Sequence, residues 1–448
     1  MSKPNIIFFF SDQQRWDTLG CYGQKLPVTP NLDRYAKQGT RFENAFTCQP
    51  VCGPARACLQ TGLYATQNGC YRNGIALKTD AKTIAKSFNA KGYQTAYIGK
   101  WHLASNVGRS REKIGGRFNY STKPIPERLR GGYKDYWLAS DVLEFTSRSY
   151  KGHMFDGDMQ KVPLKGYRAD GMTDLALDFI KKTDKTKPFF LFLSYIEPHH
   201  QNDRFRYEGP KGSKEKFKDF EVPGDLVGKR GDWKRSYPDY LGCCNSLDYN
   251  FGRIMSRLEA SGMDKNTIVI YTSDHGSHFK TRNSEYKRSC HDASIRIPML
   301  AFGPGFEGGQ VIKEMVSLID IPPTFLSCAG IEPEEKMSGK PLQKLLNEKG
   351  RKEHENEIFA QISESEVGRL LRTPEWKYSI TAVGKDGWLD MGGEIYRESH
   401  LYDLKNDPHE LNNLVHSPHH KEIRADLAKR LKRRMEKVGE GSVRIEPA

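Results

Sequence analysis

Short runs of hydrophobic residues recur along the first two thirds of the chain, and polar side chains follow each of them. The runs cover residues 5–10, 93–98, 189–195 and 268–272. Runs of this length without polar alternation are typical of parallel strands that helices cover on both faces. Helical periodicity marks the intervening segments 83–91, 173–182 and 246–260. The alternation predicts an α/β fold with a large, mostly parallel sheet sandwiched by helices.

The pattern changes after about residue 340. Short strand-like segments occur at 357–360 and 377–380, and a basic amphipathic helix is predicted at 421–437. With 448 residues, the chain is long enough for two structural units. We therefore expect a large α/β domain over residues 1–340. A smaller C-terminal subdomain, an antiparallel sheet plus a helix, is expected over residues 341–448.

Two long stretches lack clear periodicity, residues 105–166 and 201–238. Loops of this length inside a compact domain are usually functional or mobile. We interpret them either as walls of a substrate pocket or as solvated surface. A further hydrophobic run, residues 298–302, predicts one more strand.

Each predicted parallel strand ends in side chains that can bind or react. Asp12 and Gln13 follow the first strand, and Asp274 and His275 follow the last. The two strands between them lead to Lys100 and His102 and to His199. Because ligands bind beyond the carboxyl ends of strands in open α/β sheets, we expect these side chains to share one site.

Residues 52–62 form a distinctive segment, Cys-Gly-Pro-Ala-Arg-Ala-Cys-Leu-Gln-Thr-Gly. Pro54 suits the first turn of a helix, which continues until Thr61 and Gly62. Cys52 is therefore expected at the helix N-terminus, where backbone N–H groups and the helix dipole favour an anion. Arg56 lies one turn further on the same side and offers a fork of donors to an oxyanion. The segment predicts a site for a negatively charged ligand.

The same segment resembles the signature of the sulfatase family, Cys-x-Pro-x-Arg followed by Thr-Gly. In that family the cysteine is converted to formylglycine after translation. The segment 401–414 also resembles the sulfatase C-terminal region, so the resemblance spans nearly the whole chain. It implies an alkaline phosphatase-like fold and sulfuric ester hydrolase activity. It also implies a protein partner, a formylglycine-generating or anaerobic sulfatase-maturating enzyme that reads the signature.

The resemblance further implies a divalent metal held by Asp12, Gln13, Asp274, His275 and the modified residue 52. Carboxylate and amide oxygens suit a hard cation such as Ca²⁺. Two positions depart from the commonest family pattern, the amide of Gln13 and the imidazole of His275. These departures leave Mn²⁺ or Mg²⁺ open.

The catalytic roles also follow from the resemblance. One hydroxyl of the hydrated aldehyde would attack sulfur and expel the alcohol, and the second would then lose its proton so that sulfate leaves. Arg56 would hold the geometry of residue 52, Lys100 would bind sulfate, and His102 would take the hemiacetal proton. His199 would bind sulfate and protonate the leaving oxygen. Lys287 is the best match for a second sulfate-binding lysine, with Lys280 as its competitor.

Substrate contacts are predicted among polar side chains near these segments, with Trp101 as an aromatic platform for a sugar. Each of them has the alternative of a structural hydrogen-bonding role. The candidates are Arg72, His200, Asp203, Arg204, His278, Arg282 and His291.

The net charge of +14 favours a polyanionic partner. The basic residues are spread along the chain and form no recognised nucleic-acid module, so we expect a sulfated carbohydrate rather than nucleic acid. No hydrophobic run approaches the roughly 20 residues of a membrane span. The chain as written begins without a secretory leader, which predicts a cytoplasmic protein, or a periplasmic or secreted one if a leader was removed. The odd set of nine cysteines without a CxxC pair predicts free thiols.

Two other functions stay open. A phosphonate monoester or phosphodiester hydrolase of the same superfamily also uses formylglycine and resembles this chain at Gln13 and at the Asp274–His275 pair. The Gly-Lys-Trp-His segment with Lys100 and His102 favours the sulfatase. A non-catalytic binder of sulfated glycans would result if Cys52 remained a thiol.

Overall fold

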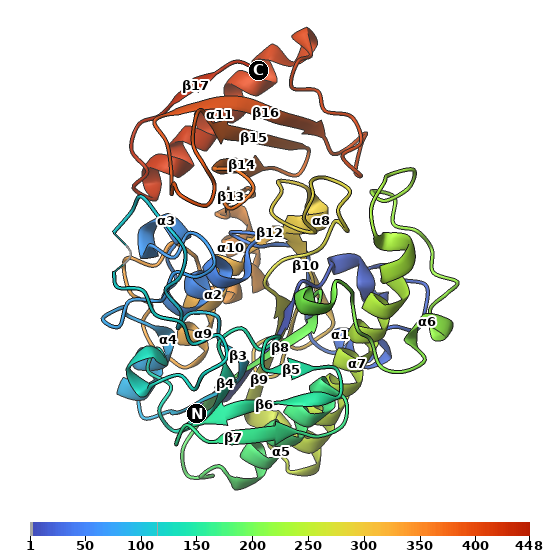
Figure 1. Ribbon diagram of the computed structural model, residues 1–448, viewed down its shortest axis with the longest axis vertical. Coiled ribbons are helices and arrows are strands. Elements are labelled where there is room, and N and C mark those ends of the chain that lie inside the picture. Colours follow the sequence, from blue (N-terminus) through green and yellow to red (C-terminus); the bar gives the residue numbers. More distant parts are fainter. Residues whose placement is uncertain (1–2, 114) are drawn as a thin grey trace.

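The computed structural model describes residues 3–113 and 115–448, and within them the chain forms two separate β-sheets (Figure 1). The first sheet has 12 strands and the second has five. The first sheet, in spatial order, consists of β10 (Arg296–Ile297), β2 (Thr40–Phe46), β11 (Met299–Phe302), β9 (Thr267–Ser273), β1 (Asn5–Asp12), β8 (Phe189–Pro198), β3 (Gln94–Lys100), β4 (Tyr136–Ser140), β6 (Lys151–Asp156) and β5 (Ser147–Arg148), while β12 (Gln310–Ser317) pairs with β2 and β7 (Lys161–Leu164) pairs with β6.

The centre of this sheet is parallel and its edges are mixed. Strands β9, β1, β8, β3 and β4 run parallel, with Ile6 of β1 opposite Phe190 of β8 and Ile268 of β9. Antiparallel strands flank this core on both sides. The predicted α/β fold is confirmed, and the strand predicted at 298–302 is β11, which runs antiparallel to β9.

Helices cover both faces of the central strands. The helices are α1 (Pro30–Ala36), α2 (Cys52–Thr61), α3 (Ala65–Asn68), α4 (Ile84–Ala90), α5 (Arg168–Lys182), α6 (Ser213–Lys216), α7 (Trp233–Ala260), α8 (Asp292–Ile295), α9 (Ile321–Cys328), α10 (Glu348–Lys352) and α11 (Lys421–Lys437).

Alternate residues of β1 point to the two faces, as the pleat of a strand requires. Phe8 and Phe10 belong to the hydrophobic cluster under α2, α4 and α9. Ile7 and Phe9 belong to the cluster under α5 and α7. All of these side chains are buried, so the uninterrupted hydrophobic run of β1 reflects helices on both sides.

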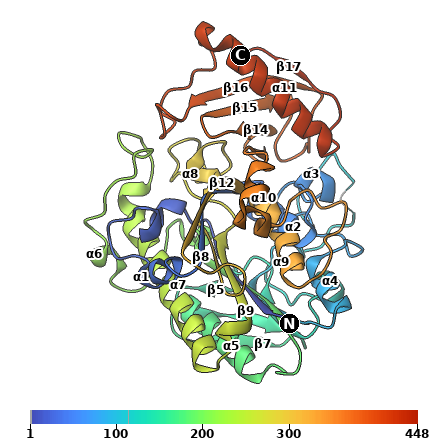
Figure 2. The ribbon, with the colours of Figure 1, turned by 180° about the vertical axis from the view of Figure 1, so that it is seen from behind.

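The second sheet forms the C-terminal end of the molecule (Figures 1 and 2). Its order is β13 (Ile358–Ile362), β14 (Gly368–Arg372), β15 (Trp376–Ala382), β16 (Ile395–Asp403) and β17 (Arg444–Glu446). The first four strands are antiparallel, β17 is parallel to β16, and α11 packs against β14 and β15. The antiparallel sheet and its helix agree with the prediction, and the boundary at residue 340 stays a prediction.

The stretches predicted as loops contain more regular structure than expected. Strands β4, β5, β6 and β7 lie within residues 105–166, and α7 begins at Trp233 inside the stretch 201–238. All nine cysteines are free thiols, as expected. Among the described residues, no helix combines the length and the apolar character that a membrane span requires.

Candidate active site

The carboxyl ends of the central strands and the N-terminus of α2 meet at one place. Asp12 ends β1 and Lys100 ends β3, while His199 directly follows β8. Asp274 and His275 directly follow β9. All five side chains are buried, because the helices and the second sheet close over this edge of the first sheet. The shared site expected from the strand ends is present in the structure.

Cys52 begins α2 and points into this site. Its Sγ lies 3.2 Å from Nε2 of His275, 3.4 Å from Oδ1 of Asp12 and 2.7 Å from Nζ of Lys287. A thiol at a helix N-terminus beside ammonium groups is stabilised as its anion. Burial alone would raise the pKa of Cys52, but the charges of Lys100 and Lys287 and a hydrogen bond with His102 hold that pKa well below its ordinary value. Residue 52 therefore occupies a strongly electropositive position.

Asp12 is held by two basic side chains. Its Oδ2 accepts hydrogen bonds from Arg56 at 2.8 Å and from Lys100 at 2.7 Å. The burial of Asp12 opposes ionisation, yet the positive charges of Lys100, His199 and Arg56 lower its pKa. The other guanidinium nitrogen of Arg56 donates to Oγ of Ser194 and to the backbone oxygen of Lys100. Arg56 thus fixes the ends of β1, β3 and β8 relative to one another.

The donor set beside Cys52 fits a divalent metal ion. Asp12, Cys52, Asp274 and His275 each offer a ligand atom, and these atoms lie within 4.8 Å of one another. Oε1 of Gln13 and Oδ2 of Asp274 are buried without a hydrogen-bond partner. Nε2 of Gln13 donates to Tyr207 and Ser277, which fixes the amide orientation. Unpaired buried oxygens are costly, and a bound cation would supply the partner that they lack.

The electrostatics of this cluster also favour a cation. Burial, and then the negative charge of Asp12, raise the pKa of Asp274 to about 7. A bound divalent ion would remove this repulsion and keep both carboxylates ionised. Nδ1 of His275 lies 2.9 Å from the backbone oxygen of Gly276, which leaves Nε2 as the nitrogen facing the cluster.

Two further histidines and a lysine surround residue 52. Nδ1 of His199 lies 3.5 Å from Oε2 of Glu144, and its Nε2 lies 3.5 Å from Nζ of Lys287. Burial, and then the charge of Lys100, lower the pKa of His199. His102 borders the cavity beside Cys52. Of the two candidate lysines, the structure places Lys287 at the site and leaves Lys280 exposed outside the cavity.

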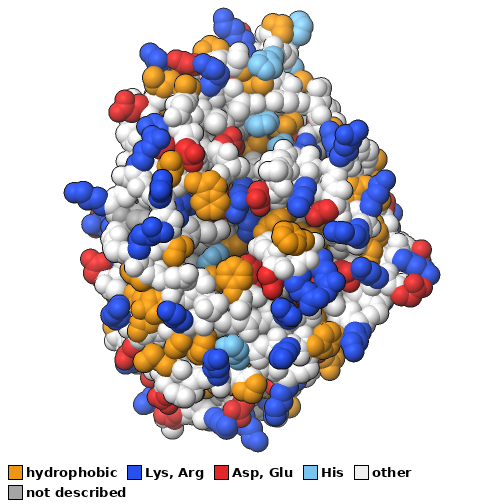
Figure 3. Space-filling model, viewed as in Figure 1, with side chains coloured by type: hydrophobic (Ala, Val, Ile, Leu, Met, Phe, Trp, Pro, Cys, Tyr) orange, Lys and Arg blue, Asp and Glu red, His pale blue; other side chains and the backbone are white. Residues whose placement is uncertain are grey.

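A cavity of about 370 Å³ opens above Cys52. It corresponds to the hollow near the middle of the face in Figure 3, where basic and hydrophobic side chains gather. The side chains that line it beside the groups already described include Arg109, Asp141, Glu144, Phe145, Asn202, Tyr286, Arg288 and Trp388.

Of the seven predicted substrate contacts, only Arg72 lines this cavity. Its guanidinium donates to the backbone oxygens of Asn73, Val107 and Arg109, so it supports the cavity wall. His200 hydrogen-bonds Asn202, Asp203 accepts from Gln201, and Arg204 pairs with Glu208. None of these three side chains lines the cavity, although Asn202, the partner of His200, does.

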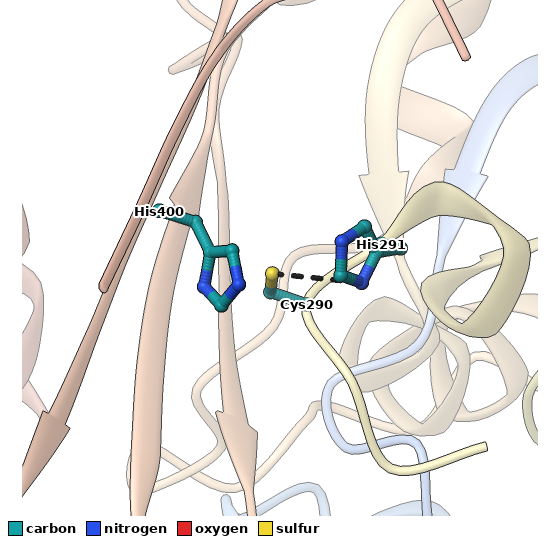
Figure 4. Close-up of side chains that lie close together, drawn as sticks. All are labelled: Cys290, His291 and His400. Atoms are coloured by element: carbon teal, nitrogen blue, oxygen red, sulfur yellow. Dashed lines mark hydrogen bonds between the residues drawn. The ribbon is translucent and has the colours of Figure 1, made fainter. Parts of the chain in front are cut away.

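The remaining candidates lie further along the chain and also have structural partners. His278 is 3.0 Å from the backbone oxygen of Lys287, and Arg282 donates to the backbone of His409 and Glu410. His291 lies beside Cys290 and His400, away from the cavity (Figure 4). The proposed platform Trp101 is fully buried and packs edge-on against Tyr97, so it offers no face to a sugar.

Several cavity residues were not anticipated from the sequence. Glu144 and Phe145 follow β4, which lies in a stretch predicted to be irregular. Asn202 begins a single 3-10 turn, Tyr286 lies in a loop, and Trp388 comes from the connection between β15 and β16 of the second sheet. In the sequence, these cavity residues could be found only by their closeness to the signature residues, because positions in loops show no periodicity.

The fold and this thiol-centred, electropositive site define a hydrolase of the alkaline phosphatase-like class. A family model described as Sulfatase matches residues 4–331, and one described as N-sulphoglucosamine sulphohydrolase, C-terminal, matches residues 284–437. The chain therefore belongs to the sulfatase family, and it is a sulfuric ester hydrolase.

Similar proteins cover nearly all of the chain. The uncharacterized sulfatase YidJ of Escherichia coli is 29% identical over 98% of this chain and 88% of its own length. The N-acetylglucosamine-6-O-sulfatase of Bacteroides thetaiotaomicron is 27% identical over 92% of this chain and 82% of its own length. The crystal structure of the putative sulfatase yidJ from Bacteroides fragilis has a TM-score of 0.81 and 26% identity, and covers 97% of this chain and 96% of that one.

The fold is shared beyond sulfatases. The phosphonate monoester hydrolase SpPMH from Silicibacter pomeroyi has a TM-score of 0.72 at 20% identity, over 98% of this chain and 96% of that one. At this identity the likeness shows the fold alone.

Proposed function

We propose that this sulfatase removes sulfate from a sulfated carbohydrate, a mono- or oligosaccharide of a sulfated polysaccharide, through a formylglycine made from Cys52. The observation that carries the proposal is the position of Cys52 at the N-terminus of α2. There it lies among the metal-ligand set, Lys287 and the Asp12–Lys100 pair. A maturation enzyme that recognises the Cys-x-Pro-x-Arg segment is the protein partner that this proposal requires.

The metal would be held by Asp12, Gln13, Asp274 and His275 together with residue 52. When bound, the metal and the hydrated aldehyde of residue 52 supply an activated oxygen nucleophile for sulfur. Three of the four remaining ligands offer oxygen, which favours Ca²⁺, while the imidazole nitrogen leaves Mn²⁺ or Mg²⁺ as alternatives.

The basic side chains would bind and orient the sulfate. Lys100 and Lys287 line the cavity together with residue 52, where their ammonium groups would offset the charge of the sulfate oxygens. Arg56 is buried below them and holds Asp12 in place through its 2.8 Å hydrogen bond. Lys100 and Lys287 would therefore contact the sulfate, and Arg56 would hold residue 52 and its ligands.

The two histidines would transfer protons in different steps of the reaction. His199 borders the cavity with its Nδ1 3.5 Å from Oε2 of Glu144, and its Nε2 would donate a proton to the leaving alcohol. His102 would accept the proton of the residue 52 hydroxyl, since it contacts residue 52 from the adjoining wall. Proton donation and proton removal are thereby assigned to different side chains.

The cavity rim suits a sugar ring. Phe145 and Trp388 line the cavity although their side chains are 50% and 43% exposed, so their faces are available for contact. Exposed aromatic rings bury the apolar faces of a ligand without losing much side-chain entropy. Arg109, also at the cavity, offers a charge for a second anionic group. The similarity to an N-acetylglucosamine-6-O-sulfatase supports the same class of substrate.

A phosphonate monoester or phosphodiester hydrolase is the second candidate. It is favoured by the cluster itself, in which Gln13 and His275 stand where the commonest sulfatase pattern has other residues. Lys100 and His102 at the cavity favour sulfate, as the Gly-Lys-Trp-His segment indicated.

The test is sulfate release by the chain co-produced with a maturation enzyme, using sulfated mono- and oligosaccharides and an aryl sulfate. An aryl phosphonate is assayed in parallel, and Cys52→Ala is the control. Mass analysis of the Cys52 peptide must show loss of the thiol sulfur. Sulfate release that disappears in Cys52→Ala supports the proposal, and turnover of the phosphonate alone overturns it.

A further inference from the structure

Outside the active site, a second cluster of metal-binding side chains lies between the first and second sheets. Cys290 and His291 directly precede α8, and His400 lies on β16. The sulfur of Cys290 lies between the two imidazole rings (Figure 4). One ligand atom from each of the three residues lies within 4.8 Å of the others, and Sγ of Cys290 is 3.9 Å from Nδ1 of His291.

We propose that Cys290, His291 and His400 bind a transition-metal ion of the zinc type. One thiolate and two imidazoles form a donor set that selects Zn²⁺ over hard cations such as Ca²⁺. With zinc bond lengths of about 2.0–2.3 Å, ligand atoms in a tetrahedral site lie about 3.3–3.6 Å apart. Metal binding would therefore require the ligand atoms to approach one another by about 1 Å from the 4.8 Å limit.

The hydrogen bonds around the two histidines present their free nitrogens to the site. The hydroxyl of Ser399 donates to Ser379, so its lone pair accepts from Nδ1–H of His400 at 3.2 Å and leaves Nε2 to coordinate. Nε2 of His291 lies 3.0 Å from the hydroxyl of Tyr402. When that nitrogen donates, Nδ1 carries the lone pair and lies 3.1 Å from Oγ of Ser289. The lone pair is available to a metal when the Ser289 hydroxyl donates instead to Ser294, whose Oγ is 2.9 Å away. Metal-binding histidines usually donate their other ring N–H in this way.

Access and charge balance also suit a metal. Cys290 and His291 are buried, whereas His400 is half-buried and provides an entry path. Binding would release the thiol proton of Cys290, forming a thiolate–metal bond and one H⁺ in solution. The three protein ligands leave a fourth tetrahedral position for water.

The site would connect the loop that carries Lys287 to the second sheet. Cys290 and His291 follow Lys287 closely in the sequence, and His400 belongs to the strand paired with β15. The donor set is separate from the Asp12–Cys52–Asp274–His275 cluster. The proposal therefore does not depend on the assigned catalytic roles.

The test is a Co²⁺ titration of the Cys52→Ala chain, followed by absorption spectroscopy. Removing the Cys52 thiol leaves Cys290 as the cysteine beside two histidines, and a thiolate–Co²⁺ bond gives an intense near-ultraviolet charge-transfer band. We expect one Co²⁺ per chain with this band, and displacement of the band by Zn²⁺. The band should disappear when Cys290→Ser is added and persist when Cys70→Ser is added, because Cys70 is buried at a distance from this cluster.

A third variant, His400→Gln, tests the imidazole. We expect its Co²⁺ affinity to fall by at least about tenfold, since one of three ligands is lost. Absence of the band in the Cys52→Ala chain, its persistence after Cys290→Ser, or failure of Zn²⁺ to displace Co²⁺ would each overturn the proposal. The titration of the Cys52→Ala chain is decisive even where a further variant does not fold.

Discussion

Arg56 is a buried cation whose two terminal guanidinium nitrogens bind different partners. One nitrogen binds Asp12, and the other binds Oγ of Ser194 at 2.6 Å and the backbone oxygen of Lys100 at 2.8 Å. A lysine keeps the charge but has no planar fork, so it cannot make these contacts together. The residue therefore contributes geometry as well as charge.

We predict that Arg56→Lys lowers kcat/KM for sulfate release by about 100-fold, because a small displacement of Asp12 misplaces the reacting groups. The free energy of unfolding should fall by about 1–3 kcal/mol, since buried acceptors lose their donor. Sulfate-release kinetics and urea unfolding measure the two effects. The exposed Arg444→Lys is the matched control and should change neither quantity. An Arg56→Lys variant with unchanged kinetics would contradict the role.

His278 contributes to stability through its protonation state. Burial, opposed only in part by its hydrogen bond to the oxygen of Lys287, lowers the pKa of His278 to about 4. The unfolded chain, with a histidine pKa near 6.5, binds the proton more readily. The stabilising contribution is therefore complete above pH 6.5 and is lost as the pH falls toward 4.

We predict that His278→Gln reduces the loss of unfolding free energy between pH 7 and pH 5 by about 2 kcal/mol relative to the unmodified chain. Glutamine keeps an N–H donor for the Lys287 oxygen but does not titrate in this range. Urea unfolding at the two pH values measures the difference. Equal pH dependence in both proteins would show that the pKa of His278 is the same in the folded and unfolded chains, and would contradict the prediction.

At the scale of elements, the parallel centre of the sheet was predictable and its edges were not. Strands β1, β3, β8 and β9 are buried almost throughout and have hydrophobic residues at their centres, because helices cover both faces. Strands β5, β6 and β7 are short and only partly buried, so their residues carry no such pattern. The helix predicted at 246–260 begins earlier in the structure, at Trp233. Pro238 argued against a helix over these first turns, since proline is rare inside helices.

The candidate site likewise contains residues that could be predicted from the sequence and residues that could not. Asp12, Lys100 and Asp274 could be predicted because they terminate recognisable strands, and Cys52 because it begins a helix within a known signature. Glu144 and Trp388 reach the cavity from connections whose paths depend on tertiary packing. The sequence contains no local signal for such paths.

The connection between β15 and β16 brings Trp388 from the second sheet to the cavity. The ring of Trp388 also contacts the guanidinium of Arg288, whose carbon lies 5.3 Å from the ring centre. We predict that Trp388→Ala raises KM for a saccharide sulfate by about tenfold and leaves kcat nearly unchanged, because the contact is equal in ground state and transition state. Steady-state sulfate release measures the two constants.

Phe205→Ala is the control for this prediction, since Phe205 is a 78% exposed aromatic residue that does not line the cavity. It should leave both constants unchanged. A fall in kcat without a change in KM for Trp388→Ala would assign the ring to the catalytic step and contradict a binding role.

At the scale of the whole molecule, the second sheet positions the loop that carries Lys287. Arg288 pairs with Glu364, and Ser365 donates to the backbone oxygen of Arg288. Arg282 donates to the backbone of His409 and Glu410 on the far side of the loop. The second sheet therefore supports one wall of the candidate site, although the predicted catalytic side chains all come from the first 340 residues.

A buried cluster makes the strongest of these connections. Nζ of Lys377 on β15 donates to Asp292 at the start of α8 and to Glu410. Burial raises the pKa of Glu410 to about 7, although Lys377 opposes the shift. Removing the ammonium would leave two buried carboxylates without their shared cation. Arg372 would still bind Asp292 at 3.3 Å, but Glu410 would keep, among the described residues, only the backbone N–H of Asp292 as a donor.

We predict that Lys377→Met lowers the free energy of unfolding by about 3–5 kcal/mol near pH 8, the usual effect of removing one partner of a buried pair. The matched control is Lys82→Met, which breaks a 2.7 Å pair between Lys82 and Glu334 at the surface and should cost no more than about 1 kcal/mol. The loss for Lys377→Met should shrink as the pH falls to 5, because protonated Glu410 carries no charge to be compensated. Urea unfolding at both pH values distinguishes this from a packing defect, because lost packing would cost the same free energy at either pH.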